Sequence, residues 1–135
     1  MGIDFFREET DWAGARSDVL AWGYPRPVGE LEAETATWVR YGQGVLVWFL
    51  PGPTDDSLAL HACAAPEVRG HLGTERHMTA IEVIGELLGA TRLFVVTGED
   101  GFDVRVPARA LRRFLRSRGW VGYERGAYRN LGVMQ

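Results

Sequence analysis

Two kinds of hydrophobic pattern alternate along this chain and predict a mixed helical and extended structure. Residues 10–22, 74–88 and 108–118 carry apolar side chains three and four positions apart, which is the spacing of one buried helix face. Between these helices, short apolar runs bounded by Gly, Pro or Asp predict strands over residues 35–41, 45–50, 58–64, 91–97, 120–123 and 127–131. The stretch from Gly23 to Glu34 contains two prolines and predicts a loop or a weak helical turn.

The order of these elements defines the expected fold class. It is helix, strand, strand, strand, helix, strand, helix and strand. The Gly42-Gln43-Gly44 turn suits a hairpin, whereas the two later helices suit crossover connections. We therefore expect an α/β (α+β) fold with a mixed, mostly antiparallel central sheet flanked by about three helices. No Ser/Gly linker divides the chain, so a single domain over residues 1–135 is predicted.

Composition narrows the setting of the protein. Hydrophobic residues make up 46% and charged residues 24% of the sequence, as in soluble globular proteins. Cys63 is the single cysteine, so an internal disulfide is excluded. The longest apolar run, residues 45–50, is too short to span a bilayer, and the N-terminal residues do not resemble a secretory signal. These features predict a cytoplasmic protein without membrane contact.

Charge is distributed unevenly along the chain. All 15 basic residues are Arg, and eight of them fall within residues 105–135, where Glu124 is the lone acid. This asymmetry favours either an anionic ligand or pairing of the arginines with acids elsewhere in the domain. Because no base-reading motif accompanies the arginines, nucleic acid is the less favoured partner.

A glycine-bearing turn with cationic side chains follows the predicted strand 58–64. It runs Glu67-Val68-Arg69-Gly70-His71-Leu72-Gly73-Thr74 and leads into the helix 74–88. Backbone N–H groups at such a helix start can bind an anionic ligand, although a plain strand-to-helix turn capped by Thr74 has the same pattern.

From Leu58 to Trp120 the chain resembles the GCN5-related N-acetyltransferase (GNAT) superfamily. Strand, phosphate-binding turn, helix, diverging strand and a helix ending in Gly119-Trp120 follow in the family's order. The resemblance implies a first strand at Ile3–Phe6. Leu72 and Thr74 stand where the family's turn has small residues, which marks a divergent sequence of the kind found among phage GNAT-like proteins.

The resemblance implies transfer of an acetyl group from acetyl-CoA to an unknown amine acceptor. It assigns contact with the coenzyme to the end of the strand and to the turn, at Cys63, Ala64, Arg69, Gly70, His71, Leu72, Gly73 and Thr74. Cys63, which lies between alanines, is expected to be a small core residue rather than a nucleophile. No residue spacing suggests a metal site.

Three residues are candidates for a role in proton transfer. His61 and Glu67 are candidate bases for the amine, and Tyr128 is a candidate acid for the leaving thiolate. His61 could equally be a hydrogen-bonded sheet residue. The family's usual acid, a Tyr four residues before the Gly of the Gly-Trp pair, is replaced by Leu115.

Two functional classes therefore lead, with a nucleic-acid-associated protein that acts through the arginine-rich end as a third possibility. One is a divergent N-acyltransferase, and the other is a catalytically inactive GNAT-fold binding or structural protein, such as a phage virion or accessory protein. Protein partners or a homo-oligomer suit the second class, and it would allow a virion-associated location.

Overall fold

A seven-stranded sheet forms the centre of the computed structural model, which describes residues 6–24, 26–42, 44–68, 75–96, 108–123 and 126–132. The strands lie in the order β1-β2-β3-β4-β5-β7-β6. Their bounds are β1 Phe6–Glu9, β2 Thr37–Tyr41, β3 Val45–Pro51, β4 Ser57–Ala64, β5 Arg92–Val96, β6 Val121–Tyr123 and β7 Gly126–Asn130. Of the strand pairs, β4–β5 is parallel and the others are antiparallel. The predicted mixed, mostly antiparallel sheet is confirmed.

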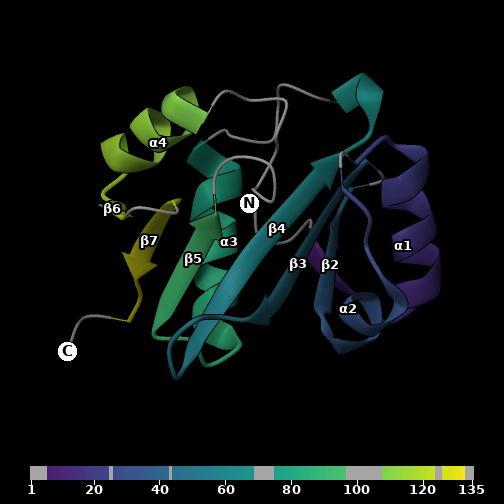
Figure 1. The fold of residues 1–135 in the computed structure, drawn as a ribbon, viewed down its shortest axis with the longest axis horizontal. Helices are drawn as coiled ribbons and strands as arrows, with labels where there is room; N and C mark the ends of the chain where they lie inside the picture. The colour runs from purple at the N-terminus through teal and green to yellow at the C-terminus, as the bar shows by residue number, and fades with distance from the viewer. Residues whose placement is uncertain are drawn as a thin grey trace.

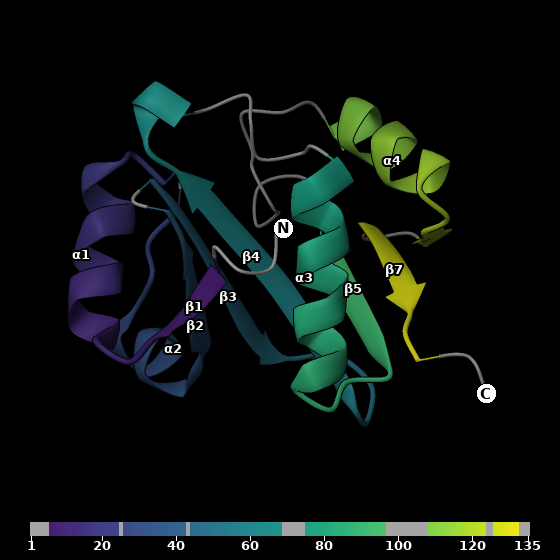
Figure 2. The same cartoon turned by 180° about the vertical axis from the view of Figure 1, so that it is seen from behind.

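Helices cover both faces of this sheet. Their bounds are α1 Trp12–Ala21, α2 Glu30–Thr35, α3 Glu75–Leu87 and α4 Ala108–Ser117, and a short 3-10 helix spans Pro66–Val68. In Figure 1, α3 lies behind β5, and it comes to the front when the molecule is turned in Figure 2. In the part of the chain that the structure describes, no helix has the length and apolar content needed to cross a membrane.

The two sheet faces carry separate hydrophobic cores. On one face, Met78 and Ile81 of α3 and Leu115 of α4 pack with strand residues that include Leu60 and Ala62. On the other, α1 and α2 cover a cluster made of Ala15, Val19, Tyr24, Val28, Ala33, Trp38, Leu46, Trp48 and Cys63. The alternation of side chains along β4 therefore turns His61 and Cys63 toward α1 and α2.

The front of the chain differs from prediction in two places. The first described strand is Phe6–Glu9, which continues three residues past the predicted end at Phe6; residues 3–5 of the expected strand lie outside the described residues. β1 pairs with β2 from Phe6–Tyr41 to Glu9–Trp38. Nε of Arg40 lies 2.8 Å from Oε1 of Glu9. Residues 30–34, predicted as loop or a weak helical turn, and Thr35, predicted as the start of a strand, form α2.

Candidate functional site

The sheet opens between β4 and β5. These strands pair over three positions only, from Ser57–Arg92 to Ala59–Phe94. Beyond this point β4 continues to Ala64 against β3, while Val95 and Val96 of β5 continue against β7. Figure 1 shows the two arrows diverging toward their tips. The predicted divergence of these strands is thus present in the structure.

The backbone of β4 presents hydrogen-bonding groups to this opening. The carbonyl of Ser57 accepts from Gly52, and the N–H of Ala65 donates to Gly44, so odd-numbered residues of β4 face β3. Because backbone groups alternate in direction along a strand, Leu60, Ala62 and Ala64 direct their N–H and C=O groups toward the β5 side. The Ala59–Phe94 pair engages the N–H of Leu60 with Phe94, because a parallel ladder bonds the residues on either side of each pair. Within the described residues, the groups left without a strand partner there are the carbonyl of Leu60 and the N–H and C=O groups of Ala62 and Ala64.

Of the residues expected to contact the coenzyme, only some lie in the described part of the chain, and these differ in whether they face the opening. Ala64 offers its backbone to the opening. Cys63 turns its backbone toward β3, and its side chain is fully buried between the sheet and the α1–α2 layer. The expected turn residues Arg69, Gly70, His71, Leu72, Gly73 and Thr74 lie outside the described residues.

The three catalytic candidates occupy distinct positions. His61 lies on β4, two residues past the last β4–β5 pair, and is 9% exposed. Glu67 is solvent-exposed in the 3-10 helix that follows β4. Tyr128 lies half-buried on β7, opposite Phe94, with the Arg92 guanidinium 4.8 Å from its ring centre. Since Phe94 pairs with Ala59, Tyr128 and His61 share one face of the sheet.

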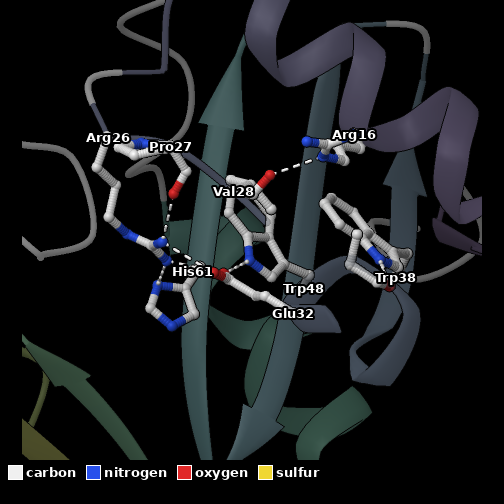
Figure 3. A network of polar contacts seen from close by, with 9 residues as sticks. Arg16, Arg26, Pro27, Val28, Glu32, Trp38, Trp48 and His61 are labelled. Atoms are coloured by element: carbon white, nitrogen blue, oxygen red, sulfur yellow. Dashed lines mark hydrogen bonds and ion pairs between the residues drawn. The ribbon is translucent and has the colours of Figure 1, made fainter. Parts of the chain in front are cut away.

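The ring of His61 is held between an aromatic side chain and a cation (Figure 3). It stacks on Trp48, with ring centres 5.6 Å apart and an interplanar angle of 22°. Nη2 of Arg26 lies 3.4 Å from its Nδ1 atom. Burial, together with the nearby Arg26 charge, lowers the pKa of His61 to about 4, although Glu32 opposes the shift. His61 is therefore neutral at physiological pH.

Arg26 is fixed in turn by Glu32. Its guanidinium donates to both carboxylate oxygens of Glu32, at 2.9 and 2.8 Å. The indole N–H of Trp48 donates to the same carboxylate at 3.0 Å. Burial alone would raise the pKa of Glu32, but the hydrogen bonds from Arg26 and Trp48 outweigh it and leave that pKa lowered. This bidentate pair is the strong form of such contacts.

Residues outside this pair anchor the segment that carries it. Arg16 of α1 donates to the carbonyl of Val28 at 2.7 Å, and the indole of Trp38 donates to the carbonyl of Ala33 at 2.8 Å. Tyr24 is 7% exposed beside Trp48, and burial raises its pKa to about 12. The segment between α1 and α2 is thus tied to α1 through Val28 and packed on β3 through Tyr24.

Sequence reasoning found His61 but missed Tyr24, Arg26, Glu32 and Trp48. Arg26 and Glu32 lie in a stretch interpreted as loop, where charged residues are ordinary. The one available signal was Tyr24-Pro25-Arg26-Pro27, an aromatic residue followed by a cation between two prolines, with acids further on at a helix start.

An apolar hollow lies on the other face of the sheet, away from these groups. It has a volume of about 270 Å³ and is lined by Phe6, Arg7, Glu8, Thr37, Val39, Ile84, Leu87 and Leu88. No cluster of His, Cys or acidic side chains able to hold a metal ion occurs among the described residues. We therefore place the candidate site at the opening of the sheet.

Comparisons with known proteins bear on the fold. No model of a protein family and no curated protein matches the sequence. A candidate acetyltransferase of the GNAT family from Desulfovibrio desulfuricans superposes with a TM-score of 0.62 at 17% identity, covering 93% of this chain and 97% of that one.

N-acetylglutamate synthase from Neisseria gonorrhoeae, complexed with coenzyme A and L-arginine, gives a TM-score of 0.60 at 16% identity. The match covers 95% of this chain but only 34% of the synthase, so this chain spans about a third of that protein. At these identities the likeness concerns architecture. Together with the diverging β4 and β5, it shows that the chain has the fold of the GNAT acetyltransferases.

Proposed function

We propose that this protein is a divergent N-acyltransferase that moves an acetyl group from acetyl-CoA to an amine. The observation that carries the proposal is the opening between β4 and β5, where Ala62 and Ala64 present backbone groups without a strand partner among the described residues. An extended molecule that contains amides can pair with such groups as an added strand would. The pantetheine arm of coenzyme A is a molecule of this kind.

The residues present suit this ligand. The side chains of Ala62 and Ala64 are small and are buried on the α3 face of the sheet. β4 is a regular strand up to Ala64, so its backbone groups keep their alternating direction along the opening. When bound, acetyl-CoA supplies an acyl group activated by its thioester bond. Of the two structures compared, one is a complex with coenzyme A, which supports the choice of ligand.

Proton transfer is assigned to Glu67 and Tyr128. Acylation forms a C–N bond, breaks the C–S bond, releases one proton from the amine and requires one at the leaving sulfur. Glu67, exposed just beyond β4, takes the amine proton directly or through water. Tyr128, on the same sheet face as His61, donates to the sulfur and is then reprotonated from water. A histidine with a pKa of about 4 is a poor base at neutral pH, so His61 is not given that role.

A second candidate function is a GNAT-fold binding protein that holds a ligand without turnover. It is favoured by Leu115 of α4, which stands where family members commonly have a Tyr that acts as the acid. Leu115 is 2% exposed and belongs to the hydrophobic core. A leucine side chain has no group that can donate or accept a proton, so this position cannot protonate the leaving sulfur.

Binding is tested with acetyl-CoA and two variants of one residue. Ala64→Pro removes the N–H directed at the opening and leaves the β3 ladder untouched, whereas Ala64→Gly keeps that N–H. Saturating acetyl-CoA is expected to raise the melting temperature of the wild type by several degrees, because it binds the native state alone. We expect a smaller rise with Ala64→Pro and a nearly unchanged rise with Ala64→Gly.

Turnover is measured as release of free thiol in the presence of a panel of amines. Binding with thiol release supports the acyltransferase, and binding without it for any amine favours the binding protein. No thermal stabilisation of the wild type at a large excess of acetyl-CoA would overturn both.

A further inference from the structure

The contact between Arg26 and His61 determines where the proton of the imidazole lies. A guanidinium has N–H donors and no acceptor. Nη2 of Arg26 lies 3.4 Å from Nδ1 of His61, so Nδ1 must be the acceptor in that contact. In a neutral imidazole one nitrogen accepts and the other donates, which places the proton on Nε2.

The same contacts fix the orientation of the ring. Glu32 grips the Arg26 guanidinium with two hydrogen bonds and accepts a third from the Trp48 indole, whose ring system stacks on His61. Arg26, Glu32 and Trp48 thus form one connected group around the imidazole. They come from the segment before α2, from α2 and from β3, respectively. As Figure 3 shows, the contacted Nδ1 side of the ring faces Arg26, and the Nε2 side points away from it.

The charges around His61 favour the neutral ring. The charged groups that act on it are Arg26 from the segment between α1 and α2 and Glu32 from α2. Tyr24 and Cys63 are the titratable groups of the buried cluster that contains Trp48, on which the ring stacks. A proton on Nδ1 would set a second N–H against the Arg26 cation in a buried site. Glu32 does not reverse this preference, because both of its oxygens are engaged by Arg26.

We propose that Arg26 is a positioning residue that holds His61 as a neutral hydrogen-bond donor, and that the Nε2–H of His61 binds the acyl carbonyl oxygen of the substrate. The second half of this proposal rests on the proposed function. His61 lies two residues past the last β4–β5 pair, beside the opening that would receive the acyl group.

The chemistry requires no proton from His61. As the amine nitrogen bonds to the carbonyl carbon, negative charge grows on the carbonyl oxygen, and a preorganised N–H stabilises it. When the oxygen re-forms the C=O bond, the C–S bond breaks and its electron pair leaves on the sulfur, which takes a proton from Tyr128, so His61 keeps its proton throughout. A neutral donor held by Arg26 therefore replaces the base suggested by the sequence.

The tautomer is measured without any ligand. Long-range ¹H–¹⁵N NMR spectra of the histidine rings, assigned with His61→Gln, should show His61 in the Nε2–H form at neutral pH. Arg26→Gln should raise the pKa of His61 and allow the Nδ1–H form, whereas Glu32→Gln should lower the pKa further, since Glu32 opposes the Arg26 charge. Arg7→Gln, at an exposed position of β1, is the control and should change neither property.

A protonated His61, or a wild-type Nδ1–H tautomer, at neutral pH would overturn the positioning role. Equal pKa shifts in the Arg26 and control variants would do the same. The carbonyl contact is tested separately by acyl transfer. His61→Gln, which keeps an N–H donor, should retain more kcat than His61→Ala, and Arg26→Gln should lower kcat at neutral pH, where part of the neutral ring takes the Nδ1–H form and offers no N–H at Nε2.

Equal kcat in the two His61 variants would overturn the donor role. If the NMR result holds but acetyl-CoA does not bind, the proposed function and the donor role fall and the positioning by Arg26 stands.

Discussion

Burial of His61 makes the stability of the protein depend on pH in the mildly acidic range. The pKa of this residue is about 4 in the folded protein and near 6.5 in the unfolded chain. Between these values the unfolded chain binds more protons, so the free energy of unfolding falls as the pH is lowered. We expect His61 to account for a loss of roughly 1.5 kcal/mol between about pH 6.5 and about pH 5.

Urea unfolding of the wild type and of His61→Gln over this range measures the effect. The variant is expected to be less stable at neutral pH because of changed packing, but its stability should depend less on pH. The pKa values of Glu9 and Glu32 are lowered from 4.5, the first by the Arg40 hydrogen bond, so their contributions are lost at lower pH. Parallel pH curves for the two proteins would contradict the assigned burial of His61.

At this scale the sequence singled out His61 as a candidate base but gave no sign of its contact with Arg26. His61 stood out because an imidazole has an intrinsic pKa near neutrality. Its partner Arg26 lies 35 positions earlier in the chain, and no local pattern links the two. The role follows from a tertiary contact that turns a predicted base into a donor, and such a contact has no periodic signature in the sequence.

At the scale of elements, one carboxylate joins α3 to the end of α4 and to β7. Glu82 accepts from the indole of Trp120 at 3.0 Å and lies 3.8 Å from Arg118 and 3.9 Å from Arg129. Its side chain is 12% exposed, so the charge is only weakly screened by solvent. Glu82→Ala is expected to destabilise the fold by about 2 kcal/mol, because the indole N–H and two cations lose a shared acceptor.

Glu86→Ala is the matched control, since Glu86 lies one turn further along α3 and is exposed. Chemical unfolding of the two variants should give a clear loss of stability for Glu82→Ala and little change for the control. Similar losses in both would mean that the helix, and not the contact across elements, determines the result.

The elements themselves were predictable wherever their periodicity was strong. Strands β3 and β4 and helix α3 begin and end within a residue or so of the predicted bounds, because buried apolar side chains repeat at the spacing of each structure. The part of β1 beyond the predicted end at Phe6 lies in an edge strand rich in charge, and edge strands carry charge without the alternating pattern. The six-residue α2 is stabilised by contacts of Trp38, Trp48 and Arg26 that lie outside its own sequence.

For the whole molecule, the uneven charge places exposed arginines at the end of the sheet where β4 and β5 diverge. Arg113 and Arg116 are exposed on α4, which lies at the same end of the sheet as the tips of β4 and β5 (Figures 1 and 2). The acidic residues are concentrated before residue 105. A ligand that carries phosphates at one end would therefore meet positive potential beside the opening.

Binding of acetyl-CoA is accordingly expected to weaken as salt rises, because Arg113 and Arg116 attract its phosphates through solvent. The double variant Arg113→Gln/Arg116→Gln should bind acetyl-CoA severalfold more weakly at low salt and show a shallower salt dependence by calorimetry. S-acetylpantetheine, which has the same arm and no phosphate, separates the two contributions: its affinity should be equal in both proteins and nearly independent of salt. If the double variant keeps full affinity for acetyl-CoA at low salt, the phosphates are bound by other residues, and the arginines of α4 serve packing and solubility alone.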